Sequence, residues 1–197
     1  EEKYGQLVVV YTCDVQAIAR RVAESKVLMR LAKQFPALME QLPRFIWHGS
    51  LGKYQYFALS EVPGMTIDRP CPGTEIAKCN ATSWLIKLHR STSMWCKDSQ
   101  ETFDRLVGSL FQFAIDRYPA LHVDIEQIEQ GVRQRALGRD WLTVWQHGDF
   151  KLENLILDPN SFSIVGVIDW ELSNEHGLPL LDILYLVVYG RSVELSM

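Results

Sequence analysis

The alternation of hydrophobic and polar positions divides the first part of the chain into short strands and one long helix. A β-branched and aromatic run, LVVVYT, is typical of a strand. Val27, Leu28 and Leu31 recur at helical spacing and indicate a helix with one buried face, which Asp14 is suited to cap. The sequence Val62-Pro63-Gly64 then interrupts the pattern. The expected elements are strands at residues 7–12, 44–48 and 54–61 and a helix at residues 15–35.

The second part of the chain is predicted to be mainly helical. Apolar residues recur at helical spacing, and Leu110, Phe113 and Ile128 are expected on the buried faces of their helices. A short strand precedes His147, and a hairpin follows it. The expected elements are helices at residues 74–91, 100–118 and 124–137, a strand at residues 142–145, and hairpin strands at residues 155–157 and 164–168.

The most apolar run lies near the end of the chain, at residues 178–189. It is too short to span a membrane and contains Asp182, so it is expected to form a buried helix. No membrane partner is therefore indicated. A lone carboxylate inside such a helix requires a polar partner, because its burial is otherwise costly.

Composition and charge narrow the class of protein. The 197 residues are 47% hydrophobic and 22% charged, which is ordinary for a globular chain. The net charge is −4 and there is no basic stripe, so a nucleic-acid partner is not expected. The four cysteines form no CxxC pair, which is typical of reduced thiols, and a cytoplasmic location is expected.

The strongest chemical signal is His147-Gly148-Asp149, followed by Asn154 and, at the end of an apolar run, Asp169. A hairpin brings its two open ends together, so Asn154 and Asp169 are expected to meet. Mg²⁺ prefers oxygen ligands and keeps several positions for water and phosphates. One amide and one carboxylate suit that preference. Asn154 and Asp169 are therefore the candidate metal ligands.

Asp149 lies in the loop that enters the hairpin and is the candidate catalytic base. A carboxylate there can orient a substrate hydroxyl beside the γ-phosphate of Mg-ATP and accept its proton. His147 is expected to support the loop through a ring nitrogen that bonds the backbone near Asp169. Lys151 either touches the γ-phosphate or is solvated.

Glu24 is the only acid in the first predicted helix and lies on or beside its buried face. A carboxylate in that position needs a partner. In kinase-like folds, a helix glutamate of this kind pairs with a strand lysine that binds the phosphates of ATP, and such a lysine is one candidate. The other is Arg20 or Arg21, one helical turn away.

These motifs resemble the catalytic core of aminoglycoside phosphotransferases and choline kinases and, more distantly, of protein kinases. The resemblance covers residues 7–186 and is specific over residues 146–182, where Ile168-Asp169-Trp170 and Gly177-Leu178-Pro179 match small-molecule kinases. It implies an α+β, protein-kinase-like fold with two lobes. Residues 1–62 would form a small lobe of antiparallel strands and one helix, incomplete at its N-terminus. Residues 63–197 would form a truncated, mainly helical large lobe that carries the catalytic hairpin.

The resemblance also implies which cofactors the protein binds and which residues bind them. ATP and Mg²⁺ are the expected cofactors, and Glu24, Glu61 and Val62 are expected to bind the nucleotide, the last two at the hinge between the lobes. Asp182 is expected to brace the backbone of the catalytic loop.

Two departures from the family pattern leave an alternative open. The strand at residues 7–12 has no lysine, the nearest being Lys3, and no glycine-rich phosphate loop precedes it. The expected function is an ATP-dependent phosphotransferase that acts on a hydroxyl of a small molecule such as an aminoglycoside, choline or a sugar-like compound. The alternative is a catalytically impaired pseudokinase domain with a binding or regulatory role. A protein kinase is disfavoured, because Glu171 replaces the glycine of the DFG motif.

The expected partners are a small-molecule acceptor and other domains of a longer chain. Asp169, Glu171 and Glu175 put acids close to the expected acceptor position, which favours an amine-bearing acceptor. In the other interpretation, Glu171 and Glu175 are merely exposed.

Overall fold

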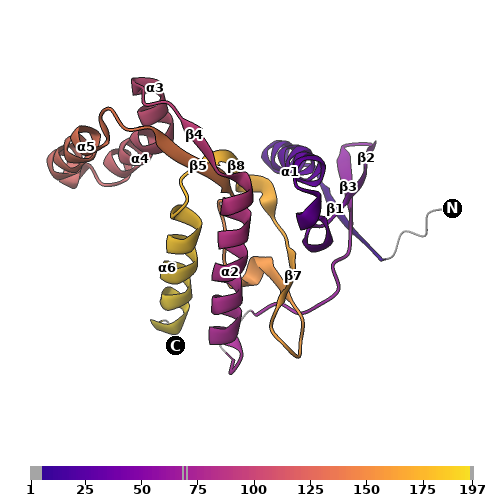
Figure 1. The fold of residues 1–197 in the computed structure, drawn as a ribbon. Coiled ribbons are helices and arrows are strands. Elements are labelled where there is room, and N and C mark those ends of the chain that lie inside the picture. The colour runs from indigo at the N-terminus through magenta and orange to yellow at the C-terminus, as the bar shows by residue number, and fades with distance from the viewer. Residues whose placement is uncertain (1–5, 68, 70, 196–197) are drawn as a thin grey trace.

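The computed structural model describes residues 6–67, 69 and 71–195 and has two lobes (Figure 1). The first lobe combines a three-stranded antiparallel sheet of order β1-β3-β2 with one long helix. The Asp14 side chain caps that helix by accepting from Ala17 N at 2.7 Å, as predicted. The elements are β1 (Leu7–Thr12), α1 (Val15–Gln34), η1 (Pro36–Gln41), β2 (Phe45–Leu51) and β3 (Tyr54–Ser60).

The strand predicted at residues 44–48 extends further than expected. β2 continues to Leu51, and Gly49 and Ser50 pair with β3 instead of forming the turn. Gly52, with φ +59, lies in the tight turn between the strands. A turn this short requires the left-handed backbone that glycine adopts readily, which leaves the residues before it free to pair.

The second lobe is mainly helical, with α2 and α6 lying side by side in Figure 1. A sheet of order β4-β5-β8 lies at one end of these helices, and the hairpin β6–β7 lies between α2 and the first lobe. The elements are α2 (Thr74–Thr92), β4 (Met94–Cys96), α3 (Gln100–Phe103), η2 (Asp104–Gly108), α4 (Ser109–Arg117), η3 (Pro119–Leu121), α5 (His122–Ala136), β5 (Trp141–Gln146), η4 (Leu152–Asn154), β6 (Leu155–Leu157), β7 (Ile164–Val167), η5 (Trp170–Leu172), β8 (Asn174–Gly177) and α6 (Leu181–Leu195).

The helix predicted over residues 100–118 is present at residues 100–117. It contains a wider, π-helical turn at η2, which joins α3 to α4 without a break and which the prediction did not include. The expected burial of Leu110, Phe113 and Ile128 was wrong, since they are 48%, 70% and 59% exposed. The reason is their place in the fold, because α3, α4 and α5 extend beyond the main body (Figure 1) and share a small core of Phe103, Leu106 and Val107.

The sequence prediction also missed the short strands β4 and β8. Both pair with β5, at Met94↔Thr143 and Val144↔Gly177, respectively. Segments of three or four residues carry too little alternation to be recognised, and only their pairing with β5 makes them strands.

The main hydrophobic core lies where α1, α2 and the hairpin meet. The ring of Trp84 stacks on Phe150 and meets Trp170 edge-on, with centroids 5.7 and 6.3 Å apart. The segment after β3 also joins this core, because Met65 and Leu157 exchange backbone hydrogen bonds of 2.9 and 2.8 Å. Gln41 Nε2, from η1 of the first lobe, donates to Ile164 O of the hairpin at 2.9 Å, so the hairpin is attached to both lobes. Among the described residues no helix, α6 included, has the length and the apolar composition that a membrane span needs.

Truncating the hairpin core tests this arrangement. Leu157 is fully buried, so Leu157→Ala is expected to lower the free energy of unfolding by about 2–5 kcal/mol. Leu180→Ala makes the same chemical change at a side chain that is 65% exposed, and it is expected to cost at most about 0.5 kcal/mol. Equilibrium urea denaturation measures both. Equal losses in the two variants would contradict the core described here.

Candidate active site

A buried carboxylate holds the loop that begins at His147. Asp182, at the start of α6, accepts hydrogen bonds from His147 N at 2.7 Å and Gly148 N at 2.9 Å. This is the bracing contact that the family resemblance implied. Gly148 has φ +88, and a Cβ there would lie 2.2 Å from Leu172 O, so the loop requires glycine at this position.

The His147 ring links the loop to the end of the hairpin. Its Nε2 lies 2.9 Å from Ile168 O, and its Nδ1 accepts from Asp149 N at 3.3 Å. The predicted contact with backbone near Asp169 is therefore present. Since Nδ1 accepts, Nε2 carries the proton and the ring is neutral. Burial lowers the pKa of His147, although the nearby Asp182 carboxylate opposes that effect.

Asp149 projects from this loop and is held by the residues around it. Its Oδ2 accepts from Asn154 Nδ2 at 2.9 Å and pairs with Lys151 Nζ at 2.9 Å. Burial acts to raise the pKa of Asp149, but hydrogen bonds from Lys151, Tyr185 and Asn154 outweigh it and leave the pKa below its ordinary value. The carboxylate is therefore ionised at neutral pH. Lys151 contacts Asp149 and is not simply solvated.

The hairpin brings Asn154 and Asp169 to the same place, as its geometry predicted. Ile168 N donates to Asn154 O at 3.0 Å, next to the β6–β7 ladder. Both side chains line a cleft of about 470 Å³ between the lobes. Asp169 has φ +66, an uncommon conformation for any residue other than glycine, which marks a constrained position.

The two side chains offer oxygen atoms suited to a metal ion. Asp169 Oδ1 is buried and has no hydrogen-bond partner among the described residues. Asn154 uses its Nδ2 to contact Asp149, which leaves its side-chain oxygen available as a ligand. Among the described residues, no group of three or more His, Cys, Asp or Glu side chains is placed to hold a metal ion. A site with one amide and one carboxylate fits Mg²⁺, which keeps waters and phosphates as its other ligands.

Glu24 is buried and lines this cleft, and of its predicted partners Arg21 is the one that the structure places beside it. Its Oε2 lies 2.6 Å from Arg21 Nη1, and its Oε1 accepts from Trp170 N at 3.2 Å. Burial raises the pKa of Glu24, and the Arg21 guanidinium counters that effect. Lys3, the nearest lysine to β1, lies outside the described residues.

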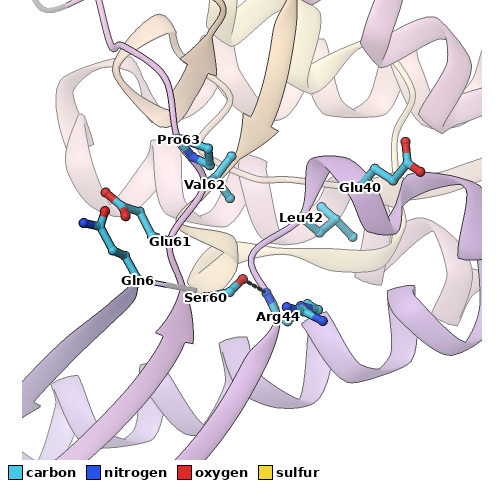
Figure 2. A pocket seen from close by; sticks show the side chains of 8 residues that line it. All are labelled: Gln6, Glu40, Leu42, Arg44, Ser60, Glu61, Val62 and Pro63. Atoms are coloured by element: carbon cyan, nitrogen blue, oxygen red, sulfur yellow. Dashed lines mark hydrogen bonds between the residues drawn. The ribbon is translucent and has the colours of Figure 1, made fainter. Parts of the chain in front are cut away.

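Glu61 and Val62 follow β3 and line the same cleft, so the structure brings together all three residues expected to bind nucleotide. Glu61 and Val62 also line a second cavity, together with Leu42 and Arg44 among others (Figure 2). Glu61 N donates to Gln6 O at 2.9 Å, and Val62 Cγ1 lies 2.5 Å from where a Cβ on Gly166 would be. The segment is thus packed against both the sheet and the hairpin.

The acids expected near an acceptor have partners on α1. Glu171 lies 3.5 Å from Arg20 and 3.7 Å from Arg21, and Glu175 forms an ion pair with Arg30. Neither glutamate is merely exposed. Because both are paired, they add little to the charge argument for an amine-bearing acceptor, which stays a prediction.

Two site residues were missed by the sequence prediction. Arg21 was considered only as a surface partner of Glu24, yet it lines the cleft. Tyr185 contributes a hydrogen bond to Asp149. Its spacing of three residues from Asp182 on α6 was the available signal, because residues at that spacing share a helix face.

The fold is that of a protein-kinase-like phosphotransferase. The structure resembles aminoglycoside phosphotransferase APH(3'')-Id from Streptomyces rimosus, solved with ADP and streptomycin, with a TM-score of 0.66, 18% identity and coverage of 96% of this chain and 73% of that one. It also resembles an aminoglycoside-3'-phosphotransferase of type VIII, with a TM-score of 0.58, 19% identity and coverage of 92% and 68%. Residues 10–195 match the Phosphotransferase enzyme family, and the chain belongs to that family.

Curated relatives match over a shorter stretch. Acyl-CoA dehydrogenase family member 11 of Mus musculus is 44% identical over 43 residues, which is 22% of this chain. Acyl-CoA dehydrogenase family member 10 of Mus musculus is 45% identical over 49 residues, which is 25% of this chain. The matches cover 5% and 4% of the lengths of these relatives.

The buried neutral His147 predicts a dependence of stability on pH. Its pKa is lowered in the folded chain, whereas the unfolded chain titrates near pH 6.5. Below that pH the unfolded state binds a proton that the folded state does not. The free energy of unfolding should therefore fall as the pH drops, by at most about 1.4 kcal/mol per pH unit from this group.

Urea denaturation between pH 7.5 and 5.5 measures this effect. His147→Gln should flatten the pH profile, whereas His122→Gln, at an exposed side chain, should leave it unchanged. A His147→Gln profile parallel to that of the unmodified protein would contradict the assignment.

Proposed function

We propose that this chain is a phosphotransferase domain that moves the γ-phosphate of Mg-ATP to a hydroxyl of a small molecule. The observation that carries the proposal is the position of Asn154. Its Nδ2 contacts the Asp149 carboxylate at 2.9 Å, while its side chain lines the cleft with Asp169. A candidate base and the two candidate metal ligands therefore form one connected group, which is the arrangement that phosphoryl transfer requires.

Asp149 is the proposed base. Its ionised carboxylate would accept the proton of the acceptor hydroxyl as that oxygen bonds to the γ-phosphorus and the bond to ADP breaks. Lys151 Nζ, 2.9 Å from Asp149 Oδ2, would hold the carboxylate in place and is also proposed to contact the transferred phosphate. His147 would act through the backbone and not on the substrate.

Asn154 and Asp169 are the proposed Mg²⁺ ligands, and Glu61 and Val62 the proposed contacts for the base of ATP. Bound Mg²⁺ would neutralise phosphate charge and orient the phosphates for in-line transfer. Its fit here rests on Asp169 Oδ1, which is buried without a hydrogen-bond partner among the described residues and lies 3.6 Å from Arg21 Nη1, and on the side-chain oxygen of Asn154. An amine-bearing alcohol, such as an aminoglycoside or choline, is the proposed acceptor class.

One observation favours the alternative of a pseudokinase. The residues of β1 that line the cleft are Val8 and Val10, so the described part of this strand supplies no cation for the phosphates. A pseudokinase would bind nucleotide without transferring phosphate. A transfer assay on the unmodified chain therefore separates the two functions.

Asp149→Asn tests the proposed base. This variant keeps the size of the side chain but cannot accept the proton, so kcat is expected to fall by about 10²–10⁴-fold while the affinity for ATP changes little. ADP release is measured with a panel of amine-bearing and neutral alcohols. Asp116→Asn, on the exposed surface of α4, is the matched control and should retain full activity. Unchanged turnover in Asp149→Asn would refute the proposed role.

Asp169→Asn tests the proposed metal site. Removing one carboxylate should weaken ATP binding in the presence of Mg²⁺ by at least about tenfold and leave Mg²⁺-free binding nearly unchanged. Titration calorimetry with and without EDTA measures both values. Asp158→Asn, in the turn at the other end of the hairpin, is the control. If Mg²⁺ strengthens binding equally in both variants, Asp169 does not hold the metal.

A further inference from the structure

The cleft between the lobes has one cationic side chain in an unexpected position. Among the described residues that line it, Arg21 is the only lysine or arginine. It comes from α1 and not from the sheet. The β1 residues that line the cleft are Val8 and Val10, which pair with Leu59 and Phe57 of β3. A residue on this face of β1 can reach the cleft, but valine offers no charge there.

Arg21 lies where the acids of the cleft converge. Its Nη1 is 2.6 Å from Glu24 Oε2 and 3.6 Å from Asp169 Oδ1, and its Nη2 is 3.7 Å from Glu171 Oε2. Glu24 is fixed in turn by the hydrogen bond from Trp170 N. The guanidinium is therefore anchored beside the proposed metal ligand, by a carboxylate that is itself held by the segment after β7.

The guanidinium has donors left for a ligand. Among the described residues, Arg21 donates one hydrogen bond, to Glu24, and its other contacts exceed hydrogen-bond distance. A guanidinium carries five N–H donors in a fixed fork that matches phosphate oxygens. The Arg21 side chain is 26% exposed, so part of it is accessible from the cleft.

Charge also favours a cation at this point. Glu24 and Asp169 line the cleft, and Glu171 lies 3.7 Å from Arg21 Nη2. Arg20 pairs with Glu171, at 3.5 Å. These carboxylates would repel an ATP phosphate chain, and Arg21 would offset part of that repulsion together with the proposed Mg²⁺.

We propose that Arg21 binds the phosphate chain of the nucleotide, with Glu24 holding its guanidinium, so that a helix arginine supplies the cation that β1 lacks. This inference rests on the proposed function, because it assumes that ATP enters the cleft. It adds a residue that neither the family resemblance nor the motif pattern assigned. It also explains why a strand without lysine is compatible with an intact Asp149, Asn154 and Asp169.

The test compares the affinities of ATP, ADP and adenosine by titration calorimetry, with and without Mg²⁺. Arg21→Met should weaken ATP and ADP binding by about 10- to 100-fold, the loss expected for a hydrogen-bonded charge, and leave adenosine unchanged. Arg20→Met, at the neighbouring and more exposed arginine, should bind all three like the unmodified protein. Adding Val10→Lys to Arg21→Met restores a cation from the strand and should recover most of the lost affinity.

Removing Arg21 leaves the buried Glu24 carboxylate without its ion-pair partner, which could destabilise the fold. A second variant separates that effect from a loss of phosphate binding. Arg21→Met combined with Glu24→Gln carries no unpaired buried charge and should show the same selective loss for ATP and ADP. An unchanged ATP affinity in both variants would overturn the proposal, as would an equal loss for adenosine. A higher ATP affinity in Arg21→Met would also overturn it, because Arg21 would then block the site.

The unmodified protein distinguishes this inference from the proposed function. If it binds Mg-ATP and transfers phosphate while Arg21→Met is unaffected, the role of Arg21 is wrong and the function stands. If the unmodified protein binds ATP no better than adenosine, the proposed function fails, and the role of Arg21 fails with it.

Discussion

The geometry of the site depends on the buried carboxylate of Asp182. It accepts from the backbone of His147 and Gly148, two N–H groups that would otherwise be buried without partners at a cost of about 1–3 kcal/mol each. The His147 ring then bonds Ile168 O, one residue before Asp169. A single acid on α6 thus sets the position of the loop, and the loop sets the position of the hairpin end. The relation between Asp149, Asn154 and Asp169 follows from these contacts.

A second set of contacts joins α1 to the segment that follows Asp169. Arg20, Arg21 and Arg30 pair with Glu171 and Glu175, but these ion pairs are partly exposed and contribute little individually. The buried contact is different, because Glu24 accepts both from Arg21 and from Trp170 N. Among the polar contacts between α1 and this segment, Glu24 is therefore the buried one, and it adds to the packing of Leu28 and Leu31 in the main core. A phosphate bound by Arg21 as proposed would act on this same junction, so nucleotide binding would be coupled to the position of α1.

The absence of a lysine from β1 has a different meaning in the folded chain. In the sequence it counted against catalysis, because the phosphate-binding cation of kinase-like folds was expected on that strand. In the structure a guanidinium stands beside Glu24 and 3.6 Å from Asp169. If Arg21 binds phosphate as proposed, the cation that β1 lacks comes from α1.

The sequence by itself determined the order and chemistry of the central groups. The spacing of His147, Asp149 and Asn154 and the hairpin before Asp169 were sufficient, because a hairpin and a short loop are local structures whose geometry follows from nearby residues. Most of the first lobe and the burial of Leu28 and Leu31 were also predictable, from helical and strand periodicity.

Only the tertiary structure decided which groups from distant elements meet. Arg20 and Arg21 are both one helical turn from Glu24, and packing of α1 against the segment after Asp169 places Arg21 in the cleft. The exposure of Phe113 and the pairing of β4 and β8 with β5 could not be predicted from the sequence either. Each depends on what lies beside a segment and not on the segment itself. The periodicity of hydrophobic residues predicts which face of a single helix or strand is apolar. Burial and charge pairing depend instead on two elements that pack together.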